Sequence, residues 1–478
     1  MKHSLNFKRV FKDQFNYPMK KNPIIILAVF LFFANVSCTN TKRDSSTEWE
    51  YLFNGTDLTG WVKKNGQAPY QVIDSAIVGT TILNTPNSFL CTDRNFSDFI
   101  LELEFKVDPS MNSGVQFRSN SYPEYQDSRV HGYQFEIDPS DRAFTGGIYD
   151  EARRGWLYPL SDNENSEARS AFKNGAWNKF RIEAIGNCIK TWVNGVPVTK
   201  LYDDADSTGF IALQVHSIGQ DSAMLGKQIM WKNIRIITKD PQKYATDSPA
   251  KTRSFLVNTL TKEEIAEGWK LLFDGQSSKG WRKAYAEIFP EKGWKIENGI
   301  LSVLPATGAE SQNGGDIVTV DEYSNFELLL QTKITDGANS GVKYFVTEQE
   351  VNNPGSAIGL EYQILDDVLH PDAKLGNHEG SRTFASLYDL IKAQNKRVNA
   401  MGQWNNVRII SLNNHVEHWL NGFKVLEYDR GSAEFRKLVS ESKYKDFKAF
   451  GEAEKGHILL QDHGNEVFFR SIKLREIK

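Results

Sequence analysis

Short segments in which apolar and polar residues alternate follow one another along most of the chain. Examples are FILELEF (Phe99–Phe105), FRIEAI (Phe180–Ile185) and VRIISL (Val407–Leu412). Successive side chains of a β-strand point to opposite faces, so this alternation predicts half-buried strands. Asn-Gly and Asp-Gly pairs, which favour tight turns and hairpins, separate many of these segments. The regular strand–turn spacing, with almost no helical periodicity, predicts an all-β protein built as an antiparallel β-sandwich or jelly roll.

Two of the predicted strands carry polar side chains along one whole face. They are GYQFEIDPS (Gly132–Ser140) and GLEYQILDD (Gly359–Asp367), and each has aromatic and aliphatic residues on the other face. The polar positions are Gln134, Glu136 and Asp138 in the first strand, and Glu361 and Gln363 in the second. Either these positions line a sugar-sized groove, or each strand is an ordinary amphipathic strand with one solvated face.

The two halves of the chain repeat one another, with their motifs in the same order. Matching pairs are Leu52–Trp61 with Leu272–Trp281, Met111–Arg118 with Ala338–Phe345, Gly175–Gly195 with Gly402–Gly422, and Gly209–His216 with Gly456–His463. A chain of 478 residues is also too long for one ordinary core. We therefore expect a tandem duplication, with one antiparallel sandwich at 48–239 and a second at 261–478.

A polar, proline-containing stretch at 240–260 is the predicted linker between the two sandwiches. Directly after it, Thr261 and Glu264 have the spacing of a capping box, which predicts the start of a short helix. A second helical segment is expected near Ala433–Val439.

The N-terminal segment predicts export and a lipid anchor. Met19–Cys38 has two lysines, an apolar run too short for a stable membrane span, and small residues before a cysteine, as secretory signals do. Asn35–Cys38 resembles a bacterial lipoprotein cleavage box. We therefore expect a signal peptide at 1–38, membrane attachment through a lipid on Cys38, and a polar tether at 39–47. The protein would then lie in the bacterial cell envelope, either periplasmic or associated with the outer membrane. The alternative is an ordinary signal peptide with an incidental cysteine.

The rest of the composition excludes some classes of function. The formal net charge of −3 gives no electrostatic footprint for nucleic acid. No later segment is apolar enough to span a bilayer. Cys91 and Cys188 are compatible either with a disulfide in an oxidising envelope compartment or with two buried free thiols.

Four residues outside the two polar strands are candidates for proton transfer or charge stabilisation. His216 and His463 each follow a glutamine on the polar face of another strand. A histidine there is a proton carrier near neutral pH, or else an ordinary surface or core histidine. Arg118 and Lys343 occupy polar positions of strands that follow Asn-Ser-Gly turns.

A basic and aromatic cluster follows Tyr149 in the first half. Arg153, Arg154 and Trp156 are suited to contacting sugar hydroxyls, or else form a solvated charge run. The second half keeps Tyr388 at the matching position but has lysines in place of the arginines.

Several other chemistries lack their motifs. The sequence has no Gly-x-Ser-x-Gly elbow, no HExxH, no phosphate-binding GxxxxGK[ST] and no Cys–His metal spacing. The motifs that the sequence does contain require no cofactor. A carboxylate-bound divalent ion such as Ca²⁺ stays compatible with Asp138, Asp366 and Asp367, which end the polar strands.

Taken together, the motifs resemble those of the 3-keto-disaccharide hydrolase family. The residues that carry the resemblance are LFNGxDLxGW, NSGVxFR, GLEYQILDD, LYD, GxWNxxRI…NG, LQxH and the closing FRxI pattern, present as two copies between Trp49 and Lys478. The resemblance implies a concanavalin-like jelly-roll fold and a bacterial envelope protein, often a lipoprotein. It also implies a carbohydrate substrate.

The family activity implies a defined chemistry. A ketone at C3 of a glycoside acidifies the hydrogen at C2, so a base can remove that proton while the aglycone leaves from C1 and water adds afterwards. Such a site needs a base, an acid for the leaving oxygen, and a group that stabilises the enolate.

The resemblance assigns candidate roles in each copy. In the second copy Glu361 and His463 are the candidate base and acid, and the substrate-binding candidates are Lys343, Gln363, Tyr388 and Asp366. In the first copy the catalytic candidates are Glu136 and His216, and the substrate-binding candidates are Arg118, Gln134, Asp138, Tyr149 and Arg154. The second copy has the commoner E-x-Q-x-x-D order of the family. The first departs from it, because Gln134 and Glu136 exchange the amide and the carboxylate.

Two alternatives stay open at this stage. One is a conventional glycosidase that uses two carboxylates on an unoxidised glycoside. The other is a carbohydrate-binding envelope lipoprotein without turnover, in which duplication raises avidity for a polymer.

Overall fold

The computed structural model describes residues 48–478 except 162–163, 308–309, 349–350, 354–355 and 448. The predicted signal peptide, the tether and Cys38 lie outside these described residues. Among the described residues, no helix is both long enough and apolar enough to cross a membrane.

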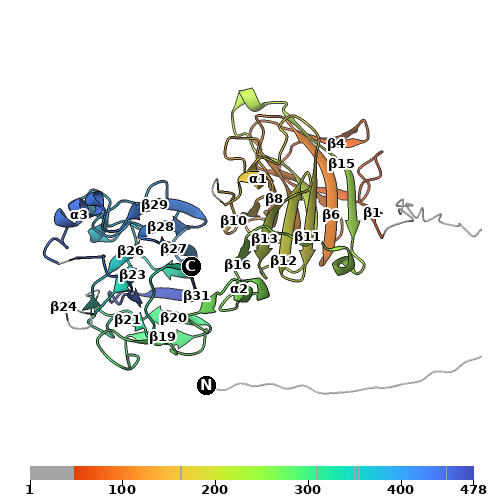
Figure 1. Cartoon of the computed structure of the whole chain (residues 1–478). Helices are drawn as coiled ribbons and strands as arrows, with labels where there is room; N and C mark the ends of the chain where they lie inside the picture. Colours follow the sequence, from red (N-terminus) through yellow and green to blue (C-terminus); the bar gives the residue numbers. More distant parts are fainter. Residues whose placement is uncertain (1–47, 162–163, 308–309, 349–350, 354–355, 448) are drawn as a thin grey trace, which may run out of the picture. The chain divides into compact units, whose positions relative to one another are not determined.

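The first half of the described chain folds into two facing sheets. The nine-stranded sheet has the order β16-β13-β12-β11-β6-β15-β4-β3, with β1 paired to β15. Its strands are β1 (Glu50–Tyr51), β3 (Tyr70–Ile73), β4 (Ala76–Thr80), β6 (Phe99–Val107), β11 (Asn178–Ile185), β12 (Cys188–Val193), β13 (Val196–Tyr202), β15 (Gln228–Ile237) and β16 (Thr252–Ser254). Figure 1 shows β6, β11, β12 and β13 lying side by side in this sheet.

The seven-stranded sheet carries the polar strand of the first half. Its order is β10-β9-β8-β7-β14-β5-β2. The strands are β2 (Trp61–Asn65), β5 (Ser88–Thr92), β7 (Ser113–Asn120), β8 (His131–Ile137), β9 (Ile148–Glu151), β10 (Gly155–Tyr158) and β14 (Phe210–Val215).

The second half repeats the arrangement with an eight-stranded and a five-stranded sheet. The eight-stranded sheet has the order β19-β20-β31-β22-β27-β28-β29, with β17 paired to β31, and the five-stranded sheet has the order β18-β21-β30-β23-β26. The first contains β17 (Lys270–Leu271), β19 (Trp294–Glu297), β20 (Ile300–Val303), β22 (Phe326–Ile334), β27 (Asn405–Leu412), β28 (His415–Leu420), β29 (Phe423–Asp429) and β31 (Val467–Glu476). The second contains β18 (Trp281–Lys283), β21 (Ile317–Thr319), β23 (Asn339–Val346), β26 (Leu360–Leu365) and β30 (His457–Leu460). A separate two-stranded sheet pairs β24 (Val351–Asn353) with β25 (Ser356–Ala357).

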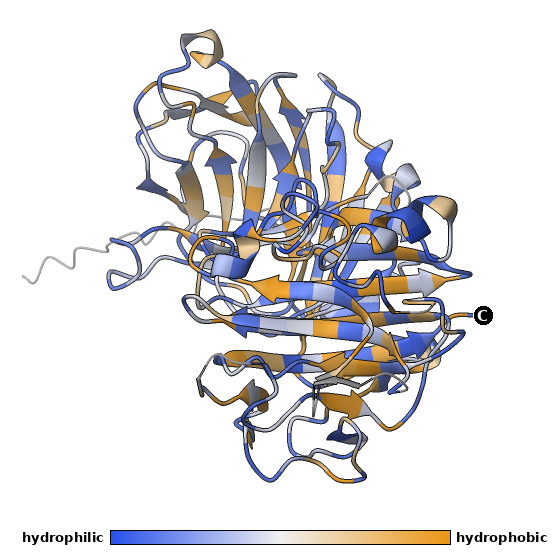
Figure 2. Ribbon diagram, turned by 90° about the vertical axis from the view of Figure 1, so that its left-hand side faces the viewer, coloured by the Kyte–Doolittle hydropathy of each residue, from blue (hydrophilic) through white to orange (hydrophobic). Residues whose placement is uncertain are grey.

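The cores form where the two sheets of each sandwich face one another. In the first sandwich Phe180 of the nine-stranded sheet stacks on Phe135 of the seven-stranded sheet, with 4.2 Å between ring centroids. Figure 2 shows both apolar and polar stretches along individual strands. The prediction of two antiparallel jelly-roll sandwiches is thereby confirmed, since the apolar face of each strand meets the opposite sheet.

Helices are few and short in the described chain. They are α1 (Ser166–Arg169), α2 (Lys262–Ala266), α3 (Ala433–Ser440) and the 3-10 turns η1 (Ser222–Met224), η2 (Pro241–Tyr244) and η3 (Pro371–Lys374). Both predicted helices are present, and Thr261 and Glu264 form the expected capping box at the start of α2.

The predicted linker contains a strand that the sequence analysis did not anticipate. Thr252–Ser254 forms β16, which pairs in parallel with β13 at the edge of the nine-stranded sheet. Every other strand pair in the described chain is antiparallel. Three residues with no apolar alternation give too little pattern to predict a strand.

The two cysteines among the described residues are free thiols. Cys91 is buried in β5 of the seven-stranded sheet, whereas Cys188 is half-buried at the start of β12 in the other sheet. The structure therefore shows two free thiols rather than a disulfide between Cys91 and Cys188.

Candidate active site

In the second sandwich the polar face of the five-stranded sheet gathers the predicted residues Glu361 and Lys343. These residues are direct partners in the antiparallel pairing of β26 with β23, and both are buried. The neighbouring position on β23 is Gly341, opposite Gln363. A Cβ on Gly341 would lie only 2.3 Å from Oε1 of Glu361. The sequence analysis placed Asn339–Gly341 in a turn, but these residues open strand β23. Gly341 therefore leaves the space across which the Glu361 side chain lies.

The ammonium group of Lys343 is held between oxygen atoms. Its Nζ donates to the carbonyl oxygen of Ala357 at 3.1 Å and lies 3.5 Å from carboxylate oxygens of both Asp316 and Glu310. Burial disfavours the charged form, but Asp316, Glu361 and Glu310 outweigh it and raise the pKa of Lys343. Lys343 is thus a fixed positive charge beside Glu361.

The carboxyl group of Glu361 is set to titrate near neutral pH. Burial raises its pKa to about 7 against the lowering effect of Lys343 and Lys443, with Glu310 and Asp316 adding to the rise. Asp316 is also shifted, to a pKa of about 6, chiefly by burial and against the pull of Lys343. A buried carboxyl group that titrates near 7 beside a fixed ammonium is suited to proton transfer at neutral pH.

Tyr388 lies next to this cluster. Its backbone N–H donates to the carbonyl oxygen of Glu361 at 3.0 Å, and its phenol donates to Asp372 at 2.8 Å. The Nζ of Lys443 lies 4.2 Å from the centroid of the Tyr388 ring. Burial, with Glu361 and Asp372, raises the pKa of the phenol, so it stays protonated and acts by position rather than as a base.

Gln363 and Asp366 have different surroundings. With its amide oriented so that the nitrogen faces acceptors, Gln363 donates to Oε1 of Glu361 at 3.0 Å. Asp366 instead accepts backbone N–H groups of Gly337, Val368 and Leu369, which lower its pKa against the effect of burial. Gln363 therefore supports Glu361, whereas Asp366 caps the turn that follows β26.

His463 lies beyond the end of β30, beside His370, and the two ring centroids are 5.8 Å apart. Among the described residues, Glu361 pairs with Gln363 and no hydrogen bond joins it to His463. The Nδ1 atom of His463 is buried without a partner in that part of the chain. The structure thus brings Glu361 together with Lys343, Gln363 and Tyr388, but it does not join the two candidates for base and acid.

In the first sandwich Glu136 occupies the matching face of the seven-stranded sheet. Its carboxylate accepts from Asn112 at 2.8 Å and from Gln134 at 2.9 Å, and Gln134 in turn accepts from Gln116 at 2.6 Å. Burial raises the pKa of Glu136 to about 7, while the hydrogen bonds from Asn112 and Gln134 oppose the rise.

The strand register relates the two faces position by position. Gly114 is opposite Glu136, whereas Gly341 is opposite Gln363. Gln116 is opposite Gln134, whereas Lys343 is opposite Glu361. Glu136 therefore stands at the position of Gln363, and the Lys343–Glu361 pair is replaced by two glutamines.

Arg118 does not take the place of Lys343. A break in the register of β7 follows Phe117, and Arg118 has a φ of 45°. Its guanidinium is buried and donates to the backbone oxygens of Ser97 and Gly186 and to Asp98. This bulge turns Arg118 away from the polar face, which alternation alone could not predict.

Tyr149 and His216 lie around Glu151, a carboxylate that the sequence analysis did not select. Burial, then the negative charges of Glu151 and Glu136, raise the pKa of Tyr149. Burial also raises the pKa of Glu151, against the effects of Arg129, of Asn87 at 3.3 Å and of the nearby, exposed His216.

The other predicted residues of the first sandwich are engaged in local ion pairs. Arg154 pairs with Asp150 and with Asp203, the latter at 2.7 Å. Asp138 accepts from Ser140 at 2.6 Å and from Arg142 at 2.9 Å. These contacts hold loops beside the polar face and leave both groups occupied by protein partners.

The carboxylates considered for Ca²⁺ each accept hydrogen bonds or ion pairs from the protein. Asp138 and Asp366 accept the contacts given above, and Asp367 accepts the backbone N–H of Phe384 at 2.7 Å and pairs with Lys396 at 2.5 Å. Each of these carboxylates thus accepts at least one donor of the protein, and a divalent ion stays a prediction from the sequence.

The sequence analysis missed Asp316, Glu310 and Lys443, which are brought to Glu361 from distant segments. Asp316 precedes β21, Glu310 lies in the segment before it, and Lys443 follows α3. Alignment of the two halves would have marked Asp316, because the first half has Phe89 at that position. Nothing in the local pattern marks Lys443.

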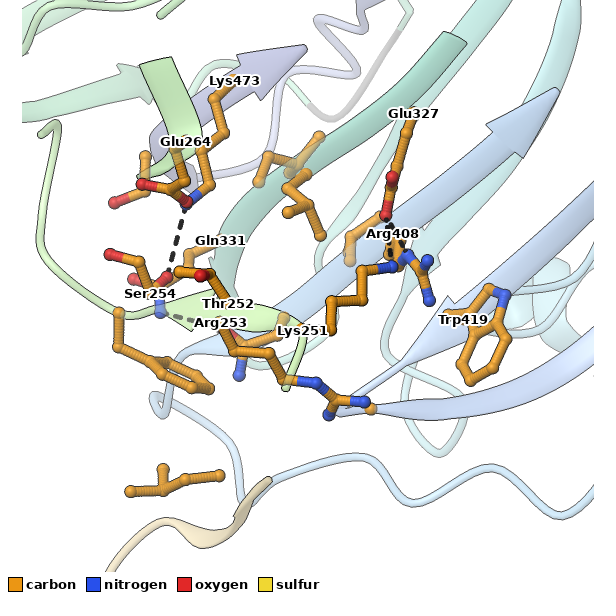
Figure 3. Close-up of a pocket in the computed structure, with 18 of the residues that line it drawn as sticks. Lys251, Thr252, Arg253, Ser254, Glu264, Glu327, Gln331, Arg408, Trp419 and Lys473 are labelled. Atoms are coloured by element: carbon orange, nitrogen blue, oxygen red, sulfur yellow. Dashed lines mark hydrogen bonds and ion pairs between the residues drawn. The ribbon is translucent and has the colours of Figure 1, made fainter. Parts of the chain in front are cut away.

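Figure 3 shows a pocket lined in part by the eight-stranded sheet, where a buried carboxylate has surroundings unlike those of Glu361. Glu327 of β22 accepts from Arg408 of β27 at 2.6 Å. Burial would raise the pKa of Glu327, but Arg408 and Lys251 hold it at about 2. Glu327 therefore stays ionised at neutral pH and forms a permanent ion pair, which distinguishes it from Glu361.

Antiparallel sandwiches with titratable carboxyl groups on a polar face fit the class of carbohydrate-active β-sandwich proteins. The chain belongs to the family of the 3-keto-alpha-glucoside-1,2-lyase-like domain, whose model matches residues 48–237 and again 268–475. This match confirms the family resemblance seen in the sequence.

Individual relatives match about half of the chain at a time. A 3-keto-disaccharide hydrolase of Bacteroides thetaiotaomicron is 36% identical over 230 residues, which are 44% of this chain and 79% of the relative. A crystal structure from Parabacteroides distasonis, assigned as a glycosyl hydrolase, is 32% identical and covers 46% of this chain and 100% of its own, with a TM-score of 0.41. The carbohydrate-binding module CBM66 of Bacillus subtilis is 16% identical and covers 37% of this chain and 95% of its own, with a TM-score of 0.26.

Proposed function

We propose that the second sandwich cleaves 3-keto-glycosides by removing the proton at C2 and releasing the aglycone from C1. The observation that carries this proposal is the buried pair of Glu361 and Lys343, in which the carboxyl group has a pKa of about 7. The family name supports the substrate class, since a 3-keto sugar has the acidic C2 hydrogen that this pair can use.

Glu361 acts as the base in this proposal. Its ionised form takes the C2 proton, and the electron pair of the C–H bond moves toward the C3 ketone to give an enolate. Lys343 is the fixed cation beside the developing negative charge, and it needs no reorganisation during the reaction. Collapse of the enolate expels the aglycone oxygen from C1, and water then adds to the resulting enone.

His463 stays the proposed acid for the leaving oxygen. The base and the acid act on different atoms of the substrate, so they do not need to contact each other in the free protein. A glycoside that extends from Glu361 on β26 across β23 to the end of β30 would bring its leaving oxygen toward His463.

Replacement of the proposed base tests the function. We expect Glu361→Gln to lower kcat for 3-ketomaltose by at least a hundredfold with little change in KM, measured by release of free glucose. Glu327→Gln, which alters a permanently ionised pair on the other sheet, is the matched control and should retain activity if the variant folds. Activity of Glu361→Gln within threefold of the parent would remove Glu361 from the mechanism, and cleavage of unoxidised maltose would favour a conventional glycosidase.

We also propose that the protein works at the cell envelope, held by a lipid on Cys38. The support is the sequence of Met19–Cys38 alone. The intact mass of protein purified from membranes should correspond to a chain that starts at Cys38 and carries acyl groups, whereas an unmodified Cys38 would exclude the anchor.

A further inference from the structure

We propose that the polar face of the first sandwich is a separate carbohydrate site that binds an unoxidised sugar and does not cleave it. This first-repeat site consists of Gln116, Gln134, Glu136 and Gln214. This proposal rests on the proposed function in one respect, which is that cleavage is assigned to the second sandwich.

The first-repeat site lacks the charge pair to which cleavage is assigned. Gln116 and Gln134 stand in the register positions of Lys343 and Glu361 and hydrogen-bond to one another at 2.6 Å. An enolate formed there would therefore find no buried ammonium beside it. The nearest cation to Glu136 is the exposed Arg142, 3.8 Å from Oε1, and its Nε already donates to Asp138.

An unpaired amide indicates that the site is built for a polar ligand. Gln214 of β14 is 0% exposed, and neither its Nε2 nor its Oε1 atom has a hydrogen-bond partner within the described chain. Leaving buried polar groups unpaired is destabilising, so such groups are rare unless a ligand or water completes them.

The position of Gln214 places this amide on the polar face. Its neighbours Leu213 and Val215 belong to the core between the two sheets, so Gln214 points to the opposite face. It is the register partner of Gly114, which in turn is opposite Glu136. Because Gly114 has no side chain, that of Gln134 lies over it, where a Cβ would be only 2.5 Å from the carboxamide carbon of Gln134. Gln134, which donates to Glu136, thus lies on this face beside Gly114.

The chemistry of these groups selects hydroxyls rather than a ketone. An amide offers donors on nitrogen and an acceptor on oxygen, and a sugar hydroxyl can both donate and accept. A ketone oxygen only accepts, so it would leave Oε1 of Gln214 unpaired. Glu136 adds an acceptor when ionised and a donor when protonated, and Tyr149 adds a phenol. The ligand expected is therefore a neutral pyranoside with its ring hydroxyls intact.

Binding of maltose to the full chain tests this site by isothermal titration calorimetry. The parent protein should bind one molecule of maltose per chain at the first-repeat site, and Gln214→Leu should weaken this binding at least tenfold. Leucine has a similar volume and removes both unpaired atoms, so the Tm of the free variant should equal or exceed that of the parent. Gln461→Leu, at the matching position of the second sandwich, is the control and should leave maltose binding within twofold.

Three results would overturn the proposal. They are unchanged maltose affinity in Gln214→Leu, no binding of maltose to the parent protein, and cleavage of 3-ketomaltose by Glu361→Gln that is abolished when Glu136→Gln is added. The last result would show that the first sandwich cleaves substrate. Because binding is measured with an unoxidised sugar, it is read independently of whether any 3-keto-glycoside is cleaved.

Discussion

At the scale of single residues, three buried glutamates show how neighbours decide the role of a carboxyl group. Glu327 lies among basic groups and has a pKa of about 2, whereas Glu361 and Glu136 have pKa values of about 7. Burial raises the pKa of all three, and only the balance with nearby donors and cations differs. Glu361 combines a pKa near neutrality with a fixed cation, which is why cleavage is assigned to it.

The pH dependence of cleavage follows from the raised pKa of Glu361. Only the ionised carboxylate can accept a proton, so kcat/KM for 3-ketomaltose should rise with pH and level off above about 7. Steady-state rates measured between pH 5 and pH 8.5 would follow this rise in kcat/KM. A rise in kcat/KM centred near pH 4.5, the ordinary pKa of a glutamate, would show that burial does not shift the pKa of Glu361 in the working protein.

At the scale of strands, the alternating pattern predicted most elements but not their irregularities. The sequence was enough for the polar faces of β8 and β26 because both strands keep a strict period of two. It could not place Arg118, because the bulge in β7 changes the direction of that side chain. In the second sandwich the matching bulge at Phe345 has a φ of 56°. Bulges depend on tertiary packing, which a local pattern does not contain.

The glycine beneath Glu361 gives a prediction at this scale. Gly341→Ala would put a Cβ 2.3 Å from Oε1 of Glu361, and the flexible carboxyl end would have to move. We expect kcat for 3-ketomaltose to fall at least tenfold while the far-UV circular dichroism spectrum stays unchanged. Gly114→Ala is the matched change in the first sandwich, where the Cβ would meet Gln134 instead, and it should spare cleavage. Full activity of Gly341→Ala would show that the position of Glu361 is not critical.

At the scale of the whole molecule, the sequence predicted two copies of one sandwich but not which groups would meet on each polar face. Asp316, Glu310 and Lys443 come from segments that lie far from Glu361 in the chain. These charges come together only when the strands of the five-stranded sheet pair and the loops fold over it. The two faces consequently share a register while carrying different charges.

The two thiols give a prediction for the assembled chain. Cys91 is fully buried, and burial raises its pKa to about 12, so it should resist alkylation in the native state. Cys188 is half-buried and should react first with iodoacetamide, as followed by mass spectrometry. Equal labelling before and after unfolding, or a mass gain only after reduction, would contradict two free thiols of unequal exposure.

The parallel strand β16 determines where a fragment containing only the first sandwich can end. Thr252–Ser254 covers the edge of β13, although the family match to the first region ends at residue 237. A fragment that stops at the family boundary would expose the unpaired backbone of β13, and open edges of this kind recruit other chains. Expression of the first sandwich alone should therefore extend to at least Phe255, whose N–H donates to Tyr202 at 2.8 Å, so that the fragment stays monomeric.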